Sequence, residues 1–476
     1  MKGKREMKIG LAVMSTLNYG NQIVNIALCN VLKKFGHRVS LIFPPKDTEN
    51  DLCQPLCLYR EFPLEEGELI VPETYKDLIS LNDQFDLFVT GGDQLFRFCF
   101  MEKMRDFAYL DWVKEEKKKI CIATSFGLDK YEITYPYVIG KGKYWFEQFY
   151  GLSIREQSGI ELLHQLFGVE NSVELMLDPV LLCDQNSLDE IGRAYKNRGD
   201  ADKYVGAYFL DPNQEKEKII NEISASLCNG KKKVVLDADL QEKNTAMPHM
   251  EAATVEDLLT VVKNSEFILT DSFHGTCLAI IYHKNFGVLF TKDNWRGLTR
   301  IQSLLKMVGL EEHLVSSYSD FLDNHALTKE IDYNTVDQIL SDKRNEGKQW
   351  IWNQLCHCRK NDVSDFTEIY QDTHLKFQDF PDNVQYVSWG GGQFLHQFYD
   401  ILIEKNVKYV CDKRKELWGV EVLPGITGVD ENELLQMPNI VIIITIDSWD
   451  ATVEIMKKVQ NLQNVKGVIH ILEMVK

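Results

Sequence analysis

One short segment, residues 270–276, combines the residue types and the position that acid–base chemistry requires. An apolar run ends there, polar residues follow and a helical pattern begins, so His274 is expected at a strand's carboxyl end, beside a helix N-terminus. Such a terminus favours anions, and an imidazole there can give or take a proton near neutral pH. The alternative is that Asp271 or Ser272 caps the helix and His274 only packs.

Two other loops that follow apolar runs carry small and polar residues of the kind that contact ligands. In the first, Gly20 lets the backbone approach a ligand, and Asn18 and Asn21 can contact hydroxyls; a plain turn with an asparagine N-cap fits equally well. In the second, Gly92 and Asp93 follow a buried-type run. Asp93 could act as a base toward a bound acceptor, but a cap for a helix beginning at the next residue is the favoured interpretation.

Alternating strand-like and helix-like segments position these loops. Two successive blocks, residues 7–190 and 200–345, predict two facing Rossmann-like domains, with ligands bound in a cleft at the carboxyl ends of their strands. Residues 346–380 are polar and aromatic, and we interpret them as a connecting helix and linker. Residues 381–476 predict a small C-terminal Rossmann-like domain, which makes the whole chain an α/β protein.

The C-terminal block contains part of a dinucleotide-binding pattern. Gly390 and Gly392 lie between a predicted strand and a predicted helix, and Asp412 ends the next strand twenty residues later, where an acid can bind ribose hydroxyls. The third glycine of the pattern is absent, because Leu395 stands in its place. A domain that docks without binding a nucleotide is therefore the favoured interpretation, with a nucleotide or sugar-nucleotide site as the alternative.

Composition and charge narrow the class of protein. The 476 residues carry a net charge of −18, which disfavours nucleic acid as the main partner, because phosphate backbones require a concentrated basic surface. The 11 cysteines lack the spacing of a zinc site, and free thiols suit a reducing cytosol. No apolar stretch approaches the roughly 20 residues of a membrane span, so any membrane contact would be peripheral. We expect a cytoplasmic protein without a bound metal; the oligomeric state stays open.

Six segments, in this order, resemble the signatures of the polysaccharide pyruvyl transferase family. Together they cover roughly residues 7–345, and six weak motifs in order are specific evidence of ancestry. They are residues 18–37 with their Asn-Tyr-Gly-Asn start, 86–94, 124–127, 153–159, 177–182 and 270–275.

The resemblance implies a fold like that of GT-B glycosyltransferases, with phosphoenolpyruvate as co-substrate and no further cofactor. The acceptor would be a glycan or lipid-linked saccharide, and the product a cyclic pyruvyl ketal with phosphate released. Such chemistry needs an acid for the enol methylene, a base for the hydroxyl and donors for the anionic groups. His274 would be the acid/base, and Arg155 the anion clamp, because a guanidinium matches a carboxylate or a phosphate. A surface ion pair between Arg155 and Glu156 or a neighbouring residue is the alternative.

One position departs from the family pattern. Some members have arginine two residues before the histidine, where this chain has Ser272. Arg296 or Arg300, farther along the chain, could replace that cation. The departure keeps two other functions open: a glycosyltransferase that uses a sugar nucleotide in the same cleft, and a glycan-binding protein without catalytic activity.

Overall fold

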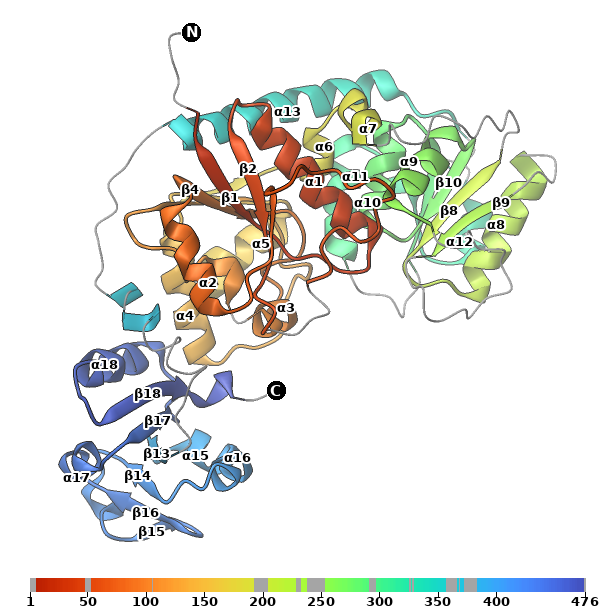
Figure 1. Cartoon of the computed structure of the whole chain (residues 1–476). Helices are drawn as coiled ribbons and strands as arrows, with labels where there is room; N and C mark the ends of the chain where they lie inside the picture. The colour runs from red at the N-terminus through yellow and green to blue at the C-terminus, as the bar shows by residue number, and fades with distance from the viewer. Residues whose placement is uncertain are drawn as a thin grey trace.

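The computed structural model describes residues 6–47, 53–104, 106–191, 204–227, 233–237, 253–290, 297–324, 327, 329–356, 366–367, 369–371 and 383–474. These residues form three sheets flanked by helices (Figure 1). The predicted α/β class, with two parallel-sheet units and a third sheet in the C-terminal region, is confirmed.

The first sheet is parallel throughout, in the order β3-β2-β1-β4-β5-β6-β7. Its strands are β1 (Lys8–Ala12), β2 (Arg38–Ile42), β3 (Leu69–Ile70), β4 (Leu87–Gly91), β5 (Lys118–Thr124), β6 (Gly151–Ile154) and β7 (Val173–Leu175). Its helices are α1 (Tyr19–Lys33), α2 (Tyr75–Ser80), α3 (Phe98–Lys103), α4 (Pro136–Glu147), α5 (Gln157–Glu161), α6 (Pro179–Leu182) and α7 (Gln185–Ile191). The strand order reverses between β1 and β4, and ligands of open α/β sheets bind outside such a point.

The second sheet is also parallel, in the order β12-β11-β10-β8-β9, and its order reverses between β8 and β10. Its strands are β8 (Val205–Phe209), β9 (Lys233–Asp237), β10 (Phe267–Thr270), β11 (Asn285–Leu289) and β12 (Leu314–Val315). Its helices are α8 (Gln214–Leu227), α9 (Val255–Asn264), α10 (Phe273–Ile281), α11 (Leu298–Val308) and α12 (Tyr318–Asp323).

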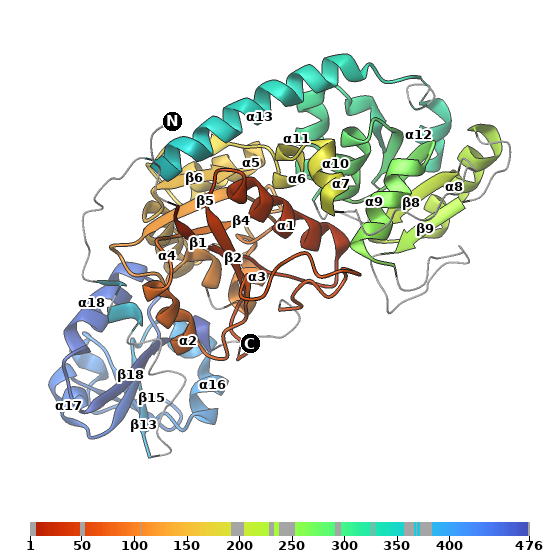
Figure 2. The same cartoon turned by 45° about the horizontal axis from the view of Figure 1, so that its top comes forward.

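A long helix, α13 (Tyr333–Cys356), joins the second unit back to the first. It contacts α11 at one end and α6 farther along, and both views show it lying across the two units (Figure 2). Its buried residues recur on one face: Val336, Leu340, Gly347, Ile351 and Leu355. We expected a connecting helix from residue 346; the helix instead begins thirteen residues earlier and runs through that position.

The third sheet has the order β15-β16-β14-β13-β17-β18, with only β15 antiparallel to its neighbour. Its strands are β13 (Gln385–Trp389), β14 (Tyr409–Cys411), β15 (Glu421–Leu423), β16 (Ile426–Val429), β17 (Ile440–Ile444) and β18 (Val465–His470). Its helices are α15 (Gln393–Gln397), α16 (Tyr399–Glu404), α17 (Glu431–Gln436) and α18 (Trp449–Val459). Helix α18 packs on α4 of the first unit.

Two apolar clusters tie these units together. One continues from the first sheet through α1 into α9 and α10 of the second unit, where it includes Leu11, Ile23, Leu258 and Ile280. The other joins the opposite face of the first sheet to the third unit. Because burial of apolar area dominates the stability of such contacts, the first cluster holds the carboxyl ends of two sheets next to each other.

Candidate active site

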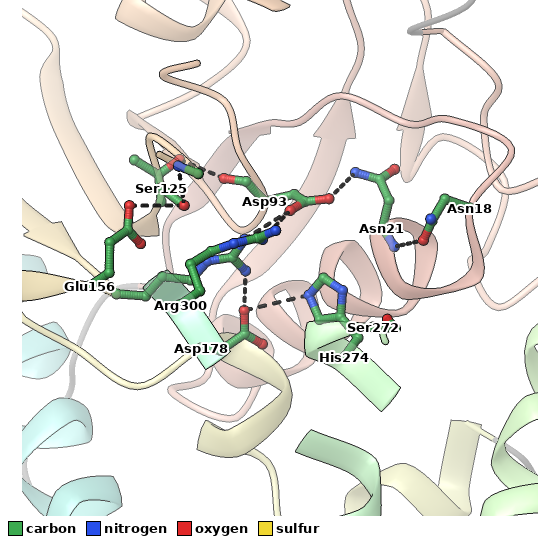
Figure 3. A network of polar contacts seen from close by, with 12 residues as sticks. Asn18, Asn21, Asp93, Ser125, Glu156, Asp178, Ser272, His274 and Arg300 are labelled. Atoms are coloured by element: carbon green, nitrogen blue, oxygen red, sulfur yellow. Dashed lines mark hydrogen bonds and ion pairs between the residues drawn. The ribbon is translucent and has the colours of Figure 1, made fainter. Parts of the chain in front are cut away.

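Charged and polar side chains from the first two units meet in one cluster (Figure 3). The first unit supplies Asn21 from the start of α1, Asp93 from the loop after β4, and Arg155 from the residue after β6. The second unit supplies His274 from α10 and Arg300 from α11. The cluster therefore lies where the carboxyl ends of both sheets converge, as the sequence predicts for a ligand site.

Asp93 lies at the centre of this cluster. Its Oδ1 accepts a hydrogen bond from Nη2 of Arg155 at 2.8 Å and lies 3.4 Å from Nη1 of Arg300. Its Oδ2 accepts a hydrogen bond from Nδ2 of Asn21 at 3.0 Å. Burial raises the pKa of Asp93, but the charges of Arg155, His274 and Arg300 outweigh burial and hold that pKa well below its usual value. Asp93 is therefore an anion in this arrangement.

Asp93 caps no helix, contrary to the favoured interpretation of the sequence. Helix α3 begins only at Phe98, and the residues before it form a turn in which the Leu95 amide donates to the Asp93 carbonyl at 2.8 Å. The hydroxyl of Thr124 donates to the same carbonyl at 3.0 Å. These bonds hold the backbone of Asp93, and the side chain faces the arginines.

Arg155 joins two acidic side chains inside the protein. Its Nη2 contacts Asp93, its Nη1 pairs with Asp178, and only 1% of its side chain is exposed. The guanidinium also lies 4.9 Å from the ring centroid of Phe273, within cation–π range. The alternative of a surface ion pair with Glu156 or a neighbouring residue is therefore wrong, because Arg155 is buried.

Arg300 brings a second guanidinium to the same place. It is the third residue of α11 and lies 5.2 Å from the ring centroid of Phe273, on which Arg155 also packs. Burial, with the nearby charge of Arg155, lowers the pKa of Arg300 to about 10, so it remains a cation at neutral pH. The other candidate, Arg296, lies outside the described residues.

His274 presents one ring nitrogen to the cluster. Nε2 lies 3.6 Å from Oδ2 of Asp178, which is within ion-pair range but too long for a hydrogen bond. Among the described residues Nε2 has no hydrogen-bond partner, and the side chain is 6% exposed. On the other side of the ring, Nδ1 lies against Gly20, where an added Cβ would come within 2.5 Å. Nε2 is thus the ring atom that can exchange a proton with a bound group.

Two polar side chains act as helix caps beside the cluster. Ser272 is the N-cap of α10 and accepts a hydrogen bond from the Gly275 amide at 3.3 Å. Asn18 is the N-cap of α1, accepts from the Asn21 amide at 3.1 Å, and lies 3.4 Å from the Tyr208 hydroxyl of the second unit. The capping interpretations of Ser272 and Asn18 are confirmed, and each cap fixes the helix start that carries a site residue.

Gly92 shapes the turn that delivers Asp93. Its φ of +104° lies in a region that favours glycine, and its amide donates to the carbonyl of Ile122 at 3.2 Å. No ligand contact is needed to explain this residue.

The structure adds two acids, Asp178 and Glu156, to the cluster. Asp178 caps α6 by accepting from the Val180 amide at 2.8 Å, and it also pairs with Arg155. Glu156 accepts from the Ser125 hydroxyl at 2.9 Å and the Phe126 amide at 2.8 Å, and burial raises its pKa. Both belong to segments that the sequence marks, but only tertiary contacts show where their side chains lie.

Several buried polar atoms of the cluster have no hydrogen-bond partner in the described part of the chain. They are Nε of Arg155, Nε of Arg300, Nε2 of His274 and Oε2 of Glu156. An unsatisfied buried polar group costs about 1–3 kcal/mol, so groups of this kind gather where a ligand or water completes them. Three potential donors close together suit a ligand with several anionic oxygens.

The predicted nucleotide pattern in the third unit brings its residues together, but the acid is already paired. Asp412 accepts from the Gly391 amide at 2.7 Å and from Nε of Arg414 at 2.8 Å. Gly390 adopts a φ of +119° against the end of β17, and Gly392 is the N-cap of a helix of five residues. The Asp412 carboxylate therefore stabilises the turn after β14. Because Arg414 already pairs with this carboxylate, a ribose would have to displace Arg414 to bind there.

Neither a metal cluster nor a membrane-crossing helix emerges from the residues described. No group of three or more His, Cys, Asp or Glu side chains among them could hold a metal ion. None of their helices combines the length and the apolar character that a membrane crossing requires.

Comparison with known families gives a match over more than half of the chain. The family model described as "Polysaccharide pyruvyl transferase" matches residues 18–289, which contain every cluster residue named above except Arg300. No curated protein matches the chain significantly.

Solved structures of several enzymes are similar to the chain. One is the UDP-GlcNAc 2-epimerase from Neisseria meningitidis bound to UDP-GlcNAc, 13% identical, with 73% of this chain and 99% of that chain covered and a TM-score of 0.46. Another is an alpha-glucosyltransferase in complex with UDP and a 13-mer DNA, 10% identical, with 74% and 96% covered and a TM-score of 0.43. A third is the wall teichoic acid polymerase TagF, 12% identical, with 78% and 90% covered and a TM-score of 0.39. With TM-scores below 0.5, these similarities do not bear on the chemistry of this chain.

Proposed function

Because the chain belongs to the polysaccharide pyruvyl transferase family, we propose that it transfers a pyruvyl group from phosphoenolpyruvate to two hydroxyls of one sugar unit. The sugar belongs to a surface polysaccharide or its precursor, and the products are a cyclic ketal and inorganic phosphate. The observation that carries this proposal is the convergence of two buried guanidinium groups and one unpaired imidazole nitrogen.

The two arginines account for donor binding. Phosphoenolpyruvate carries a carboxylate and a phosphate, and guanidinium groups bind both through paired, charge-assisted hydrogen bonds. Arg155 and Arg300 pack on the same Phe273 ring, which supports their joint use for one ligand. In this proposal Arg300 replaces the arginine that some family members have where this chain has Ser272.

His274 accounts for the proton transfers. His274, protonated at Nε2, gives this proton to the methylene carbon. The new C–H bond takes the electron pair of the C=C bond, and C2 becomes electrophilic. The oxygen of the first hydroxyl bonds to C2 and loses its proton to a base. The oxygen of the second hydroxyl then bonds to C2 while the C2–O bond to phosphate breaks, and phosphate keeps the electron pair. The second hydroxyl proton returns to His274.

A reaction with three readouts tests this function. Purified chain is mixed with phosphoenolpyruvate and a panel of glycan and lipid-linked saccharide acceptors, and released phosphate is measured with and without acceptor. Acceptor-dependent phosphate supports the proposal. Nucleoside diphosphate released from sugar nucleotides instead would identify a glycosyltransferase. Glycan binding with neither product would identify a non-catalytic binding protein.

A further inference from the structure

Asp93 occupies the position that the donor anion needs. The same oxygen, Oδ1, lies 2.8 Å from Nη2 of Arg155 and 3.4 Å from Nη1 of Arg300. One internal carboxylate therefore already uses the guanidinium groups that the proposed function assigns to phosphoenolpyruvate. An arriving anion cannot take Nη2 of Arg155 and Nη1 of Arg300 while Asp93 stays on them without placing two negative charges side by side.

Asp93 is also the more accessible partner in these ion pairs. Its side chain is 13% exposed, against 1% for Arg155 and 7% for Arg300. Of these three side chains, the Asp93 carboxylate is the one most open to solvent. Because the Asp93 carbonyl is held by Thr124 and Leu95, the carboxylate can leave by rotation of its side chain, with the backbone in place.

The charges around Asp93 decide whether it can act as a base. While the arginines and His274 surround it, its pKa is held below the usual value, and it is a weak proton acceptor. Burial acts in the opposite direction and is the largest single influence. When the negative charge of a donor offsets the charges of the two arginines, burial meets less opposition and the pKa of Asp93 rises.

We propose that Asp93 substitutes for the donor anion in the empty site, and that phosphoenolpyruvate displaces it and so releases it as the base for the acceptor. This inference rests on the proposed function. In the released state, the O–H bond of the first hydroxyl breaks, its oxygen bonds to C2, and the proton passes to the Asp93 carboxylate. The proton then passes to the departing phosphate, which restores Asp93. The acceptor is activated only when the donor is present.

The test measures anion binding and turnover in the full chain. Calorimetric titrations with phosphoenolpyruvate, and separately with inorganic phosphate, compare wild type with Asp93→Asn and Asp93→Ala. Loss of the internal carboxylate should tighten binding of both anions by about tenfold or more. Acceptor-dependent phosphate release should fall by about 10²- to 10⁴-fold, because the base is gone.

Asp86→Asn is the matched control. Asp86 lies just before β4, and Asp93 lies just after this strand. Asp86 is exposed and accepts a hydrogen bond from the Lys8 amide at 2.8 Å. The control removes the same charge and should change neither measurement.

Weaker or unchanged anion binding in both Asp93 variants, or turnover retained in either, would overturn the inference. A different result would refute the proposed donor instead: the variants bind phosphate more tightly, but wild type releases no phosphate from phosphoenolpyruvate. Asp93 would then be an internal anion in a site for another donor.

Discussion

The imidazole of His274 rests directly on Gly20, so the second unit's candidate acid is positioned by the first unit's backbone. A Cβ added at Gly20 would lie 2.5 Å from Nδ1 and 2.9 Å from Cγ of His274. Contacts that short require the ring or α1 to move. Nε2 keeps its place in the cluster only because residue 20 lacks a side chain.

Gly20→Ala should therefore lower turnover far more than it lowers stability. A displacement of about 1 Å at a reacting group costs on the order of 10²-fold in rate. Turnover and melting temperature are measured together, with Asn30→Ala, about three turns along the same helix, as the control. Wild-type turnover in Gly20→Ala would show that the position of the ring does not matter.

His274→Gln should abolish transfer while the fold stays intact. Glutamine keeps a polar side chain of similar length but cannot donate a proton as an imidazolium does, and loss of a general acid typically costs about 10²- to 10⁴-fold. Phosphate release is measured beside a melting curve. An active His274→Gln enzyme would end the assignment of this residue, whatever its effect on stability.

Arg300→Gln should weaken donor binding, because one of the two guanidinium groups is lost. We expect the KM for phosphoenolpyruvate to rise by about 10- to 100-fold, since a charge-assisted hydrogen bond contributes about 1.5–3 kcal/mol. Lys306→Gln removes an exposed cation from the same helix and should leave KM unchanged. Equal KM values in the two variants would mean that Arg300 does not hold the donor.

Much of the fold could be predicted from local sequence signals. The Asn18 N-cap marks the start of α1, and Gly36, with a φ of +84°, follows its end. Likewise, β10 and α10 are separated by the Ser272 cap. Capping residues and glycines act on the backbone within a few positions, so their effect can be predicted without knowledge of tertiary contacts.

The site could be predicted only in part, because its charges pair across long sequence separations. The ion pair between Arg155 and Asp178 and the contact between Arg300 and Asp93 join residues from different strands and units. The same limit explains the error at Asp93, where a turn held by Thr124 replaces the expected helix start. The connecting helix predicted from residue 346 is the second half of α13. The first half is missed, although the buried face of this helix already begins at Val336.

The contact of the third unit with the first should be sensitive to acid. His470 is fully buried and stacks on Tyr137 with ring centroids 3.5 Å apart; its Nε2 contacts the Ile446 carbonyl at 2.9 Å and its Nδ1 accepts from the Leu472 amide. Burial above all lowers the pKa of His470 from 6.5 to about 4. Between about pH 6.5 and pH 4, His470 therefore binds a proton in the unfolded chain but not in the folded chain.

Stability from this site is complete above pH 6.5 and falls as the pH is lowered toward 4. At about 1.4 kcal/mol per pKa unit, the loss amounts to roughly 3–4 kcal/mol. His470→Asn should show a shallower drop in melting temperature between neutral and acidic buffer than wild type does. Parallel pH curves for the two proteins would contradict this account.

A crystal structure with phosphoenolpyruvate bound tests the central claim most directly. We expect carboxylate or phosphate oxygens within about 3 Å of the guanidinium groups of Arg155 and Arg300, with the methylene carbon about 3.5 Å from Nε2 of His274. Phosphoenolpyruvate bound away from these arginines, or with its methylene turned away from His274, would contradict it.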